Sequence, residues 1–213
     1  MRNSKQGEGN QLPVTLAAIR HSIAVARDNW NSWRDVYEHR GSIATNPLLA
    51  SEHRFSIFCR EYSVSRTIRR GTQDQFRLAL LKSLSASLRD ESGKALDKLE
   101  NRLRAEFGTR GGERRVVSAV SKVASLVRPE CFVAWDRFAK KGVNVTLNRS
   151  PRTEFETYSE YLAAFGQIWH GGTGKQIRDV VKASRGRPAP EREARFMRRV
   201  LDVLLMKLGG RDI

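Results

Sequence analysis

The chain has 213 residues, of which 39% are hydrophobic and 29% are charged, and this composition is typical of a globular protein. That length allows one good core or two small lobes that share a cleft. Lys and Arg total 39 against 23 Asp and Glu, and the resulting net charge of +16 favours a nucleic acid over an anionic membrane as the partner.

No uninterrupted apolar run approaches the length of a membrane span, and the polar start MRNSKQGEGNQ does not have the form of a signal peptide. The two cysteines, Cys59 and Cys131, form no CxxC motif and no disulfide framework, which suits a reducing compartment. We therefore expect a cytoplasmic protein without a membrane partner.

The first half of the chain is predicted to be helical after a disordered tail at 1–11. Apolar residues at three- and four-residue spacing predict a first helix that begins near Pro13, and DNWN at 28–31 leaves open whether it is one helix or two. Its apolar stripe consists of Leu16, Ile19, Ile23, Ala26, Trp30, Trp33 and Tyr37. Further helices are predicted over about 47–61, 73–87 and 91–107, and GTRGG at 108–112 interrupts the pattern.

The second half continues in the same way. A helix with valines at 116, 120, 123 and 127 ends at Pro129, and a short helix runs from Trp135 to Lys141. Three more helices are predicted: one with apolar residues from 155 to 169, a short one that begins near Ile177, and a last one after the linker RGRPAP, ending at Gly209. No alternating strand pattern of useful length is present, so we predict an all-α fold of eight to ten helices.

The sequence lacks several familiar functional motifs. GGTGKQ at 171–176 lacks the first glycine and the Ser or Thr of a phosphate-binding loop, and we read it as a connection between helices. The four histidines have no metal-ligand spacing, and two cysteines cannot hold a four-thiolate cluster, so we expect neither a metal nor another cofactor.

The segment SKVASLVRPECFVAWDRF at 121–138 carries a candidate site. On its helix, Lys122 lies roughly opposite Val120, among serines that are small enough to let another surface come close. Asp136 opens the next helix, where a carboxylate is favoured both as a cap and by the helix dipole. From the residues alone, Asp136 is either a helix cap, with Lys122 a solvated lysine and Trp135 a core residue, or part of a reactive site.

This segment resembles the lysine-to-aspartate segment of the helix–hairpin–helix DNA glycosylases, especially the 8-oxoguanine glycosylase branch and small bacterial proteins of the same fold. In that family a G-x-G-x-K-V-A element begins a helix, and an apolar stretch and a proline lead to a P-V-D-x-H-like turn. Lys122 in SKVA matches the Schiff-base lysine of the family, and Asp136 in AWDRF matches its catalytic aspartate. The resemblance extends over about 110–210, where YLAAFGQIW and RRVLDVLLMKLGG are also similar.

The resemblance implies a bacterial enzyme of two helical lobes, about 12–107 and 108–213, within a single domain around a DNA-binding cleft. It would act as a monomer on double-stranded DNA and excise a damaged or modified base, in repair or in defence against phage with modified DNA. Asp136 would stabilise the sugar cation or activate the nucleophile. Lys122 would be the nucleophile if the enzyme forms a Schiff base.

The resemblance also implies a pocket for the flipped base and a grip on the DNA backbone. Aromatic candidates for the base pocket are Trp135, Trp169, Phe165 and Trp30. Arginine candidates for contacts with phosphate are Arg66, Arg69, Arg70, Arg110, Arg114 and Arg115.

The sequence departs from the family pattern at three points. Residues 118–121 read SAVS where the hairpin glycines would stand, Lys122 and Asp136 are only 14 residues apart, and Phe138 replaces a histidine. A helical DNA-binding protein that kept the fold and lost the chemistry is therefore the alternative to an enzyme.

Overall fold

A computed structural model describes residues 14–38, 68–87, 92–108, 115–184 and 190–212. Within these ranges the regular structure is helical, as predicted, apart from an isolated bridge between Ile68 and Gly108. The described helices are α1 (Leu16–Glu38), α4 (Gln73–Ser87), α5 (Gly93–Phe107), α6 (Val117–Val127), α7 (Arg137–Thr146), α8 (Tyr158–His170), α9 (Gly172–Ala183) and α10 (Pro190–Leu208). None of them combines the length and the apolar character that crossing a lipid bilayer requires.

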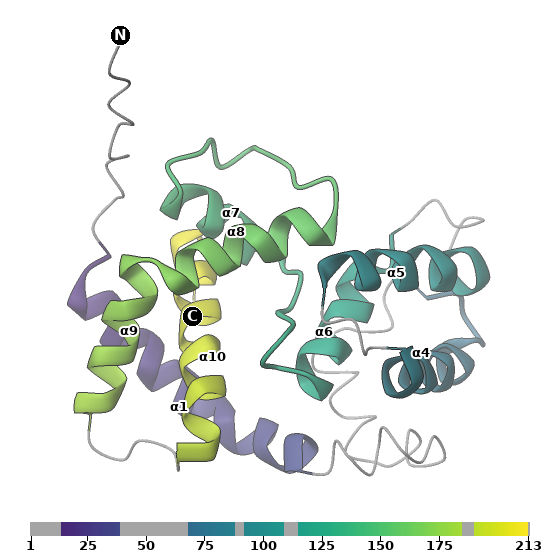
Figure 1. Ribbon diagram of the computed structural model, residues 1–213, viewed down its shortest axis with the longest axis horizontal. Coiled ribbons are helices and arrows are strands. Elements are labelled where there is room, and N and C mark those ends of the chain that lie inside the picture. Colours follow the sequence, from purple (N-terminus) through teal and green to yellow (C-terminus); the bar gives the residue numbers. More distant parts are fainter. Residues whose placement is uncertain (1–13, 39–67, 88–91, 109–114, 185–189, 213) are drawn as a thin grey trace, which may run out of the picture.

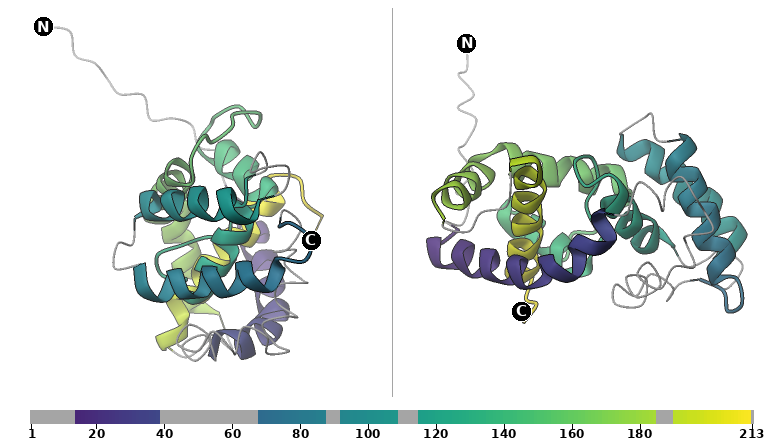
Figure 2. Two further views of the ribbon diagram at one scale, coloured as in Figure 1. Left: turned by 90° about the vertical axis from the view of Figure 1, so that its right-hand side faces the viewer. Right: turned by 90° about the horizontal axis from the view of Figure 1, so that it is seen from below.

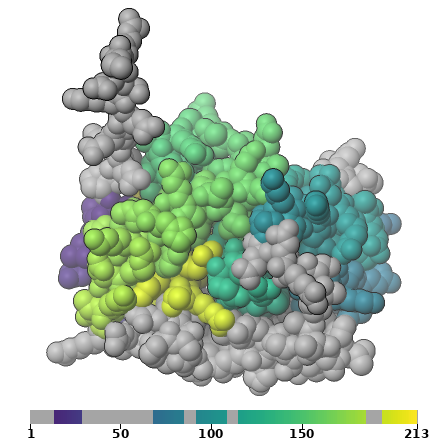
Figure 3. All heavy atoms as spheres, viewed as in Figure 1, coloured from purple at the N-terminus to yellow at the C-terminus, as the bar shows by residue number. Residues whose placement is uncertain are grey.

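The described helices pack in two groups (Figures 1 and 2). The α10 group consists of α1, α7, α8, α9 and α10, and the α5 group consists of α4, α5 and α6; α5 and α8 connect them. On the face drawn in Figure 3, α8 and α9 form the surface at one side and α4 and α5 at the other. The groups are not sequential along the chain, because α1 packs against α9 and α10 while α6 packs against α4 and α5.

The α10 group is built on the C-terminal helix. Val200, Leu201, Val203 and Leu204 of α10 are fully buried, and α7 packs closely along the same helix. Gly142 of α7 makes this approach possible, since a Cβ atom at that position would lie 1.9 Å from the carbonyl oxygen of Leu205. The close packing of the two helices places the start of α7 beside α10.

Two carboxylates of α5 cap other helices. Asp97 accepts hydrogen bonds from the backbone N–H groups of Tyr158 (2.8 Å) and Ser159 (3.0 Å) at the start of α8. Glu100, which is 1% exposed, accepts one from the backbone N–H of Val116 (2.9 Å) at the start of α6. Because the first N–H groups of a helix have no partner within it, these carboxylates both satisfy the backbone and tie the helices together.

The predicted helices differ from the observed ones mainly at their boundaries. The α1 helix runs unbroken through 28–31, and α4 coincides with the predicted 73–87. The α7 helix continues to Thr146, beyond the predicted end at Lys141. The connection expected at 171–176 is wrong, because only Gly171 separates α8 from α9 and the rest of GGTGKQ is helical. The helix predicted over 47–61 lies outside the described residues.

Candidate functional site

The chain turns sharply between α6 and α7 and comes back beside α6. Pro129 follows the last turn of α6, and the backbone N–H groups of Cys131 and Phe132 both donate to the carbonyl of Arg128 at 3.0 Å. The segment then returns along α6, where the hydroxyl of Ser121 accepts a hydrogen bond from the backbone N–H of Trp135 at 2.9 Å. A small polar residue on the lysine-bearing helix thus fixes the position of the residue immediately before Asp136.

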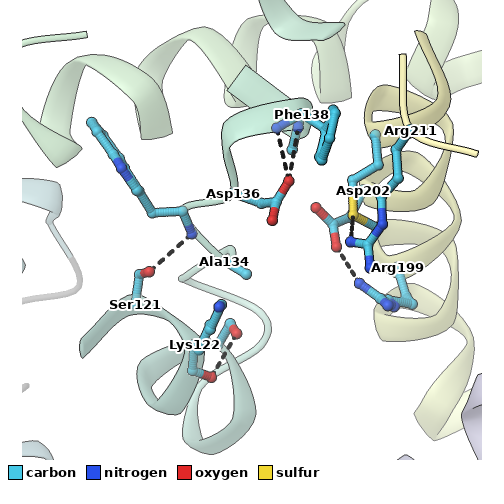
Figure 4. Close-up of polar contacts among 12 residues, drawn as sticks. Ser121, Lys122, Ala134, Asp136, Phe138, Arg199, Asp202 and Arg211 are labelled. Atoms are coloured by element: carbon cyan, nitrogen blue, oxygen red, sulfur yellow. Dashed lines mark hydrogen bonds and ion pairs between the residues drawn. The ribbon is translucent and has the colours of Figure 1, made fainter. Parts of the chain in front are cut away.

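Asp136 is the N-cap of α7, as its residue type predicts. Its backbone is extended, and one carboxylate oxygen accepts hydrogen bonds from the backbone N–H groups of Phe138 (2.8 Å) and Ala139 (3.3 Å). The two bonds satisfy backbone N–H groups at the start of α7 that have no partner within the helix. Since both bonds go to Oδ1, the second oxygen remains for other interactions; it points away from the α7 backbone in Figure 4.

Lys122 lies on the second turn of α6 and is partly buried. Figure 4 shows its side chain extending from α6 toward the segment that carries Ala134 and Asp136. Its carbonyl accepts a hydrogen bond from the hydroxyl of Ser125 at 2.9 Å. The structure therefore directs the predicted lysine toward the segment of the predicted aspartate, and Lys122 is not a fully solvated residue on an outer face.

Asp202 is a further acidic residue of this region that the sequence interpretation missed. It lies on α10, is 6% exposed and forms an ion pair with Arg199 through Oδ2. Figure 4 shows its carboxylate turned toward that of Asp136. A signal was present, because Asp202 is the only acid in the apolar run VLDVLLM, and an acid on the buried face of a helix needs a partner.

The surroundings of Asp202 disfavour its charge. Burial raises the pKa of Asp202 above its ordinary value, and the neighbouring carboxylate of Asp136 raises this pKa further, whereas Arg199 and Arg211 lower it. Burial also raises the pKa of the Tyr161 phenol on α8, with Asp202 and Asp136 both adding to the shift. The neutral phenol donates a hydrogen bond to the carbonyl of Ala134 at 3.2 Å, which further fixes the segment before Asp136.

Two of the predicted base-pocket residues are packed in the core. Phe165 is fully buried, and Trp135 is 8% exposed and packs edge-to-face on Tyr161, with ring centroids 5.4 Å apart. The Lys140 ammonium lies 4.4 Å from the centroid of the Trp135 ring, and the Arg115 guanidinium lies 5.4 Å from it. Neither aromatic ring offers an open face in the described structure.

Trp169 has a different environment. The residue is partly exposed, and two guanidinium groups lie near its ring, that of Arg178 at 5.0 Å from the centroid and that of Arg198 at 5.8 Å. Arg178 also donates to the carbonyl of Trp169 at 2.7 Å. The fourth candidate, Trp30, belongs to α1, and its side chain lies outside the described part of the structure.

The predicted phosphate-binding arginines are only partly described. Arg69 and Arg70 are exposed just before α4, and the Arg69 guanidinium donates to the carbonyl of Glu106 at 2.6 Å. Arg115 donates to the carbonyl of Glu156 at 2.6 Å and lies 3.9 Å from the buried Glu100 carboxylate. Arg66, Arg110 and Arg114 lie outside the described residues.

Across the ranges that the structure describes, no group of three His, Cys, Asp or Glu side chains is arranged to hold a metal ion. Comparisons with protein-family models, curated proteins and solved structures produced no match to this chain. The candidate site consists of the Asp136 carboxylate at the start of α7, Lys122 on α6 and the buried Asp202 on α10.

Proposed function

We propose that this protein is a DNA glycosylase that flips a damaged or modified base out of the duplex and cleaves its N-glycosidic bond. The observation that carries the proposal is the hydrogen bond between the Ser121 hydroxyl and the Trp135 N–H. It holds the helix that bears Lys122 against the segment that bears Asp136. This contact supports the proposal because it joins the residues next to the two that the resemblance selects, Lys122 and Asp136.

The Asp136 carboxylate has the properties that this reaction needs. Cleavage of an N-glycosidic bond builds positive charge on the sugar, and a fixed carboxylate stabilises that charge. The bonds from the N–H groups of Phe138 and Ala139 hold Asp136 in one orientation. They leave the second oxygen for the sugar or for the attacking nucleophile.

Two nucleophiles are consistent with this arrangement. Lys122 can attack the sugar carbon through its neutral amine, and a Schiff base would then give the enzyme lyase activity as well. Alternatively, Asp136 directs a water molecule, and the enzyme is monofunctional. A covalent enzyme–DNA intermediate forms only in the first mechanism, so its detection separates the two.

The charge of the chain supports DNA as the substrate. A net charge of +16 attracts a polyanion, and the exposed Arg70 before α4 belongs to the predicted phosphate-binding set. Both proposed roles, repair and defence against phage with modified DNA, use the same cleavage of an N-glycosidic bond. The base that is excised distinguishes between them.

The experiment that tests the proposal is an excision assay on duplex oligonucleotides that each carry one defined damaged or modified base, with DNA from phage with modified bases included. After incubation, alkali converts abasic sites into strand breaks, and omission of the alkali shows whether the protein breaks the strand itself. Product that depends on the protein supports a glycosylase. Tight binding without product from any substrate contradicts it.

A non-catalytic helical DNA-binding protein is the second candidate. It is favoured by the packing of Phe165 and Trp135 in the core and by the role of Asp136 as a helix cap, which accounts for an aspartate at this position without chemistry. In the same assay it would bind DNA and leave every base in place.

A further inference from the structure

We propose that Asp136 and Asp202 form a carboxylate pair that shares one proton, and that the proton resides on Asp202, which thereby positions the ionised Asp136. The pair itself follows from the arrangement of α7 and α10. Its part in base excision rests on the proposed function, and Asp202 is then a positioning residue for the catalytic carboxylate.

The orientation of the two carboxylates supports the existence of the pair. Oδ2 of Asp202 is bound by Arg199, whereas Oδ1 is buried and has no hydrogen-bond partner among the described residues. In Figure 4 the oxygen of Asp202 that is not bound by Arg199 points toward Asp136. A buried carboxylate oxygen without a donor is costly, and a proton on that oxygen would let it donate to the second oxygen of Asp136.

The environments of the two groups decide where the proton resides. Asp136 is partly exposed and accepts two backbone hydrogen bonds at a helix N-terminus. Asp202 is 6% exposed, and its burial raises its pKa. Two carboxylates that face each other do not both ionise easily, so the less solvated one retains the proton.

Groups from every neighbouring element act on the pair. Arg199 on α10 and Arg211 just after it favour the ionised form of Asp202, and Arg211 is held by a contact of its guanidinium with the Met206 sulfur at 3.1 Å. Tyr161 on α8 is neutral and adds no charge. Lys122 on α6 extends toward the same region. The two arginines oppose the effect of burial on Asp202, and burial is the largest influence on its pKa.

The shared proton has a consequence for the proposed reaction. When Asp202 is protonated on Oδ1, Arg199 donates a hydrogen bond to Oδ2 of a neutral acid and is no longer ion-paired with it. The pair then carries one negative charge, located on Asp136 and aimed by the hydrogen bond from Asp202. When Asp202 loses its proton at higher pH, the bond is replaced by repulsion between two carboxylates, and Asp136 is no longer held. Deprotonation of Asp202 releases its proton to solvent and changes no other group.

The direct test is a titration of aspartate carboxyl carbons by NMR in the wild type, Asp136→Asn and Asp202→Asn. We expect one carboxyl of the wild type to titrate well above the others and to be absent from Asp202→Asn. In Asp136→Asn its midpoint should fall by about one pH unit or more, because the like charge is gone. An Asp202 that titrates in the ordinary range, or whose midpoint is unchanged in Asp136→Asn, would overturn the pair.

The kinetic test compares Asp202→Asn with Asp202→Ala on a substrate that the wild type excises. Asparagine is neutral and keeps an N–H donor, so it should preserve excision and lack the decline at high pH that the proposal predicts for the wild type. Alanine should lower the rate by a factor on the order of 100, because a misplaced catalytic group loses about that much. Equal rates for the two variants at every pH would contradict the positioning role.

The control is Asp179→Asn, which makes the same change on the exposed side of α9 and should alter neither the titration nor the pH profile. Circular dichroism establishes that each variant is folded, and Asp136→Asn still reports the pair if Asp202→Ala does not fold. Coupled titration without any excision would refute the proposed function and keep the pair. Excision that depends on Asp136, together with an Asp202 that titrates independently of Asp136, would support the proposed function and refute the pair.

Discussion

The hydroxyl of Ser121 and the backbone N–H of Trp135 form a buried hydrogen bond of 2.9 Å between α6 and the segment that leads into α7. Ser121 is fully buried, and a larger side chain at this position would push the two backbones apart. The bond connects the stability of the fold to the geometry of the site, because it fixes the residue that precedes Asp136.

The first prediction follows from this bond. Ser121→Ala should lower the free energy of unfolding by about 1–3 kcal/mol, because it leaves the buried N–H of Trp135 without an acceptor. Urea denaturation measures the change. Ser118→Ala, one turn earlier on the same helix and without a hydrogen bond from its own hydroxyl in the described structure, is the control and should change stability by less than about 0.5 kcal/mol. Equal effects of the two changes would show that the bond contributes nothing.

The contact between α7 and α10 provides a second prediction. Gly142→Ala should destabilise the protein by about 3 kcal/mol or more, since the new Cβ would meet the Leu205 carbonyl oxygen at 1.9 Å and both partners are helix backbone. Gly166 on α8 has open space at its Cβ position, so Gly166→Ala should stabilise by about 0.5–1 kcal/mol. Thermal or urea unfolding distinguishes these opposite signs, and a tolerated Gly142→Ala would refute the close approach of the two helices.

The third prediction concerns the proposed catalytic role of Asp136. Asp136→Asn should keep the fold, because asparagine caps a helix nearly as well as aspartate. DNA affinity should be unchanged or slightly higher, since one negative charge is removed. Base excision should fall by a factor on the order of 100 or more, because a neutral amide does not stabilise a developing cation. Single-turnover excision and a binding assay are measured together, and normal excision by the variant would leave Asp136 as a helix cap only.

The fourth prediction separates the two nucleophiles. If Lys122 forms a Schiff base, sodium borohydride should trap a covalent complex between the wild type and its DNA substrate, and Lys122→Ala should abolish trapping. Denaturing gel electrophoresis detects the complex. Lys140→Ala is the control, because this lysine lies against the Trp135 ring and forms an ion pair with Glu154, and it should leave trapping intact. A wild type that excises without ever trapping would exclude Lys122 as the nucleophile and indicate attack by water.

The fifth prediction concerns the electrostatic contribution to the proposed binding of DNA. Affinity should fall steeply as salt rises, because counterions released from the phosphates supply much of the binding free energy. Arg70→Glu should weaken binding about equally on all sequences and reduce the slope of log affinity against log salt by about one. Fluorescence anisotropy measures both quantities. Arg70 is the better choice than Arg69, whose guanidinium already binds the Glu106 carbonyl.

The matched control for Arg70→Glu is Lys182→Glu, which makes a similar charge change on α9 in the other group of helices. It should leave the slope close to that of the wild type. An affinity that does not depend on salt would contradict the proposed basic binding surface. If Arg70→Glu weakened binding only to DNA with one modified base, Arg70 would be assigned to the base pocket and not to a contact with the DNA backbone.

The sequence by itself determined the helical class and most of the helix positions. Apolar spacing and breakers located α4 and α5 to within two residues, because helix periodicity, Gly and Pro act locally along the chain. The cap at Asp136 was predictable for the same reason, since a carboxylate satisfies the N–H groups of its own helix. The net charge, which favours a polyanionic partner, also follows from the composition alone and does not depend on the fold.

Only the tertiary structure decided which helices meet. It placed α1 with α9 and α10, brought Ser121 to Trp135, and buried Asp202 on the face of α10 turned toward Asp136. These relationships depend on packing between segments far apart in sequence, where the fit of glycines and small side chains selects the partner, and no local pattern encodes that choice. Periodicity likewise identified Phe165 as a residue of an apolar stripe, but only the packing of its neighbours showed that its ring is fully buried.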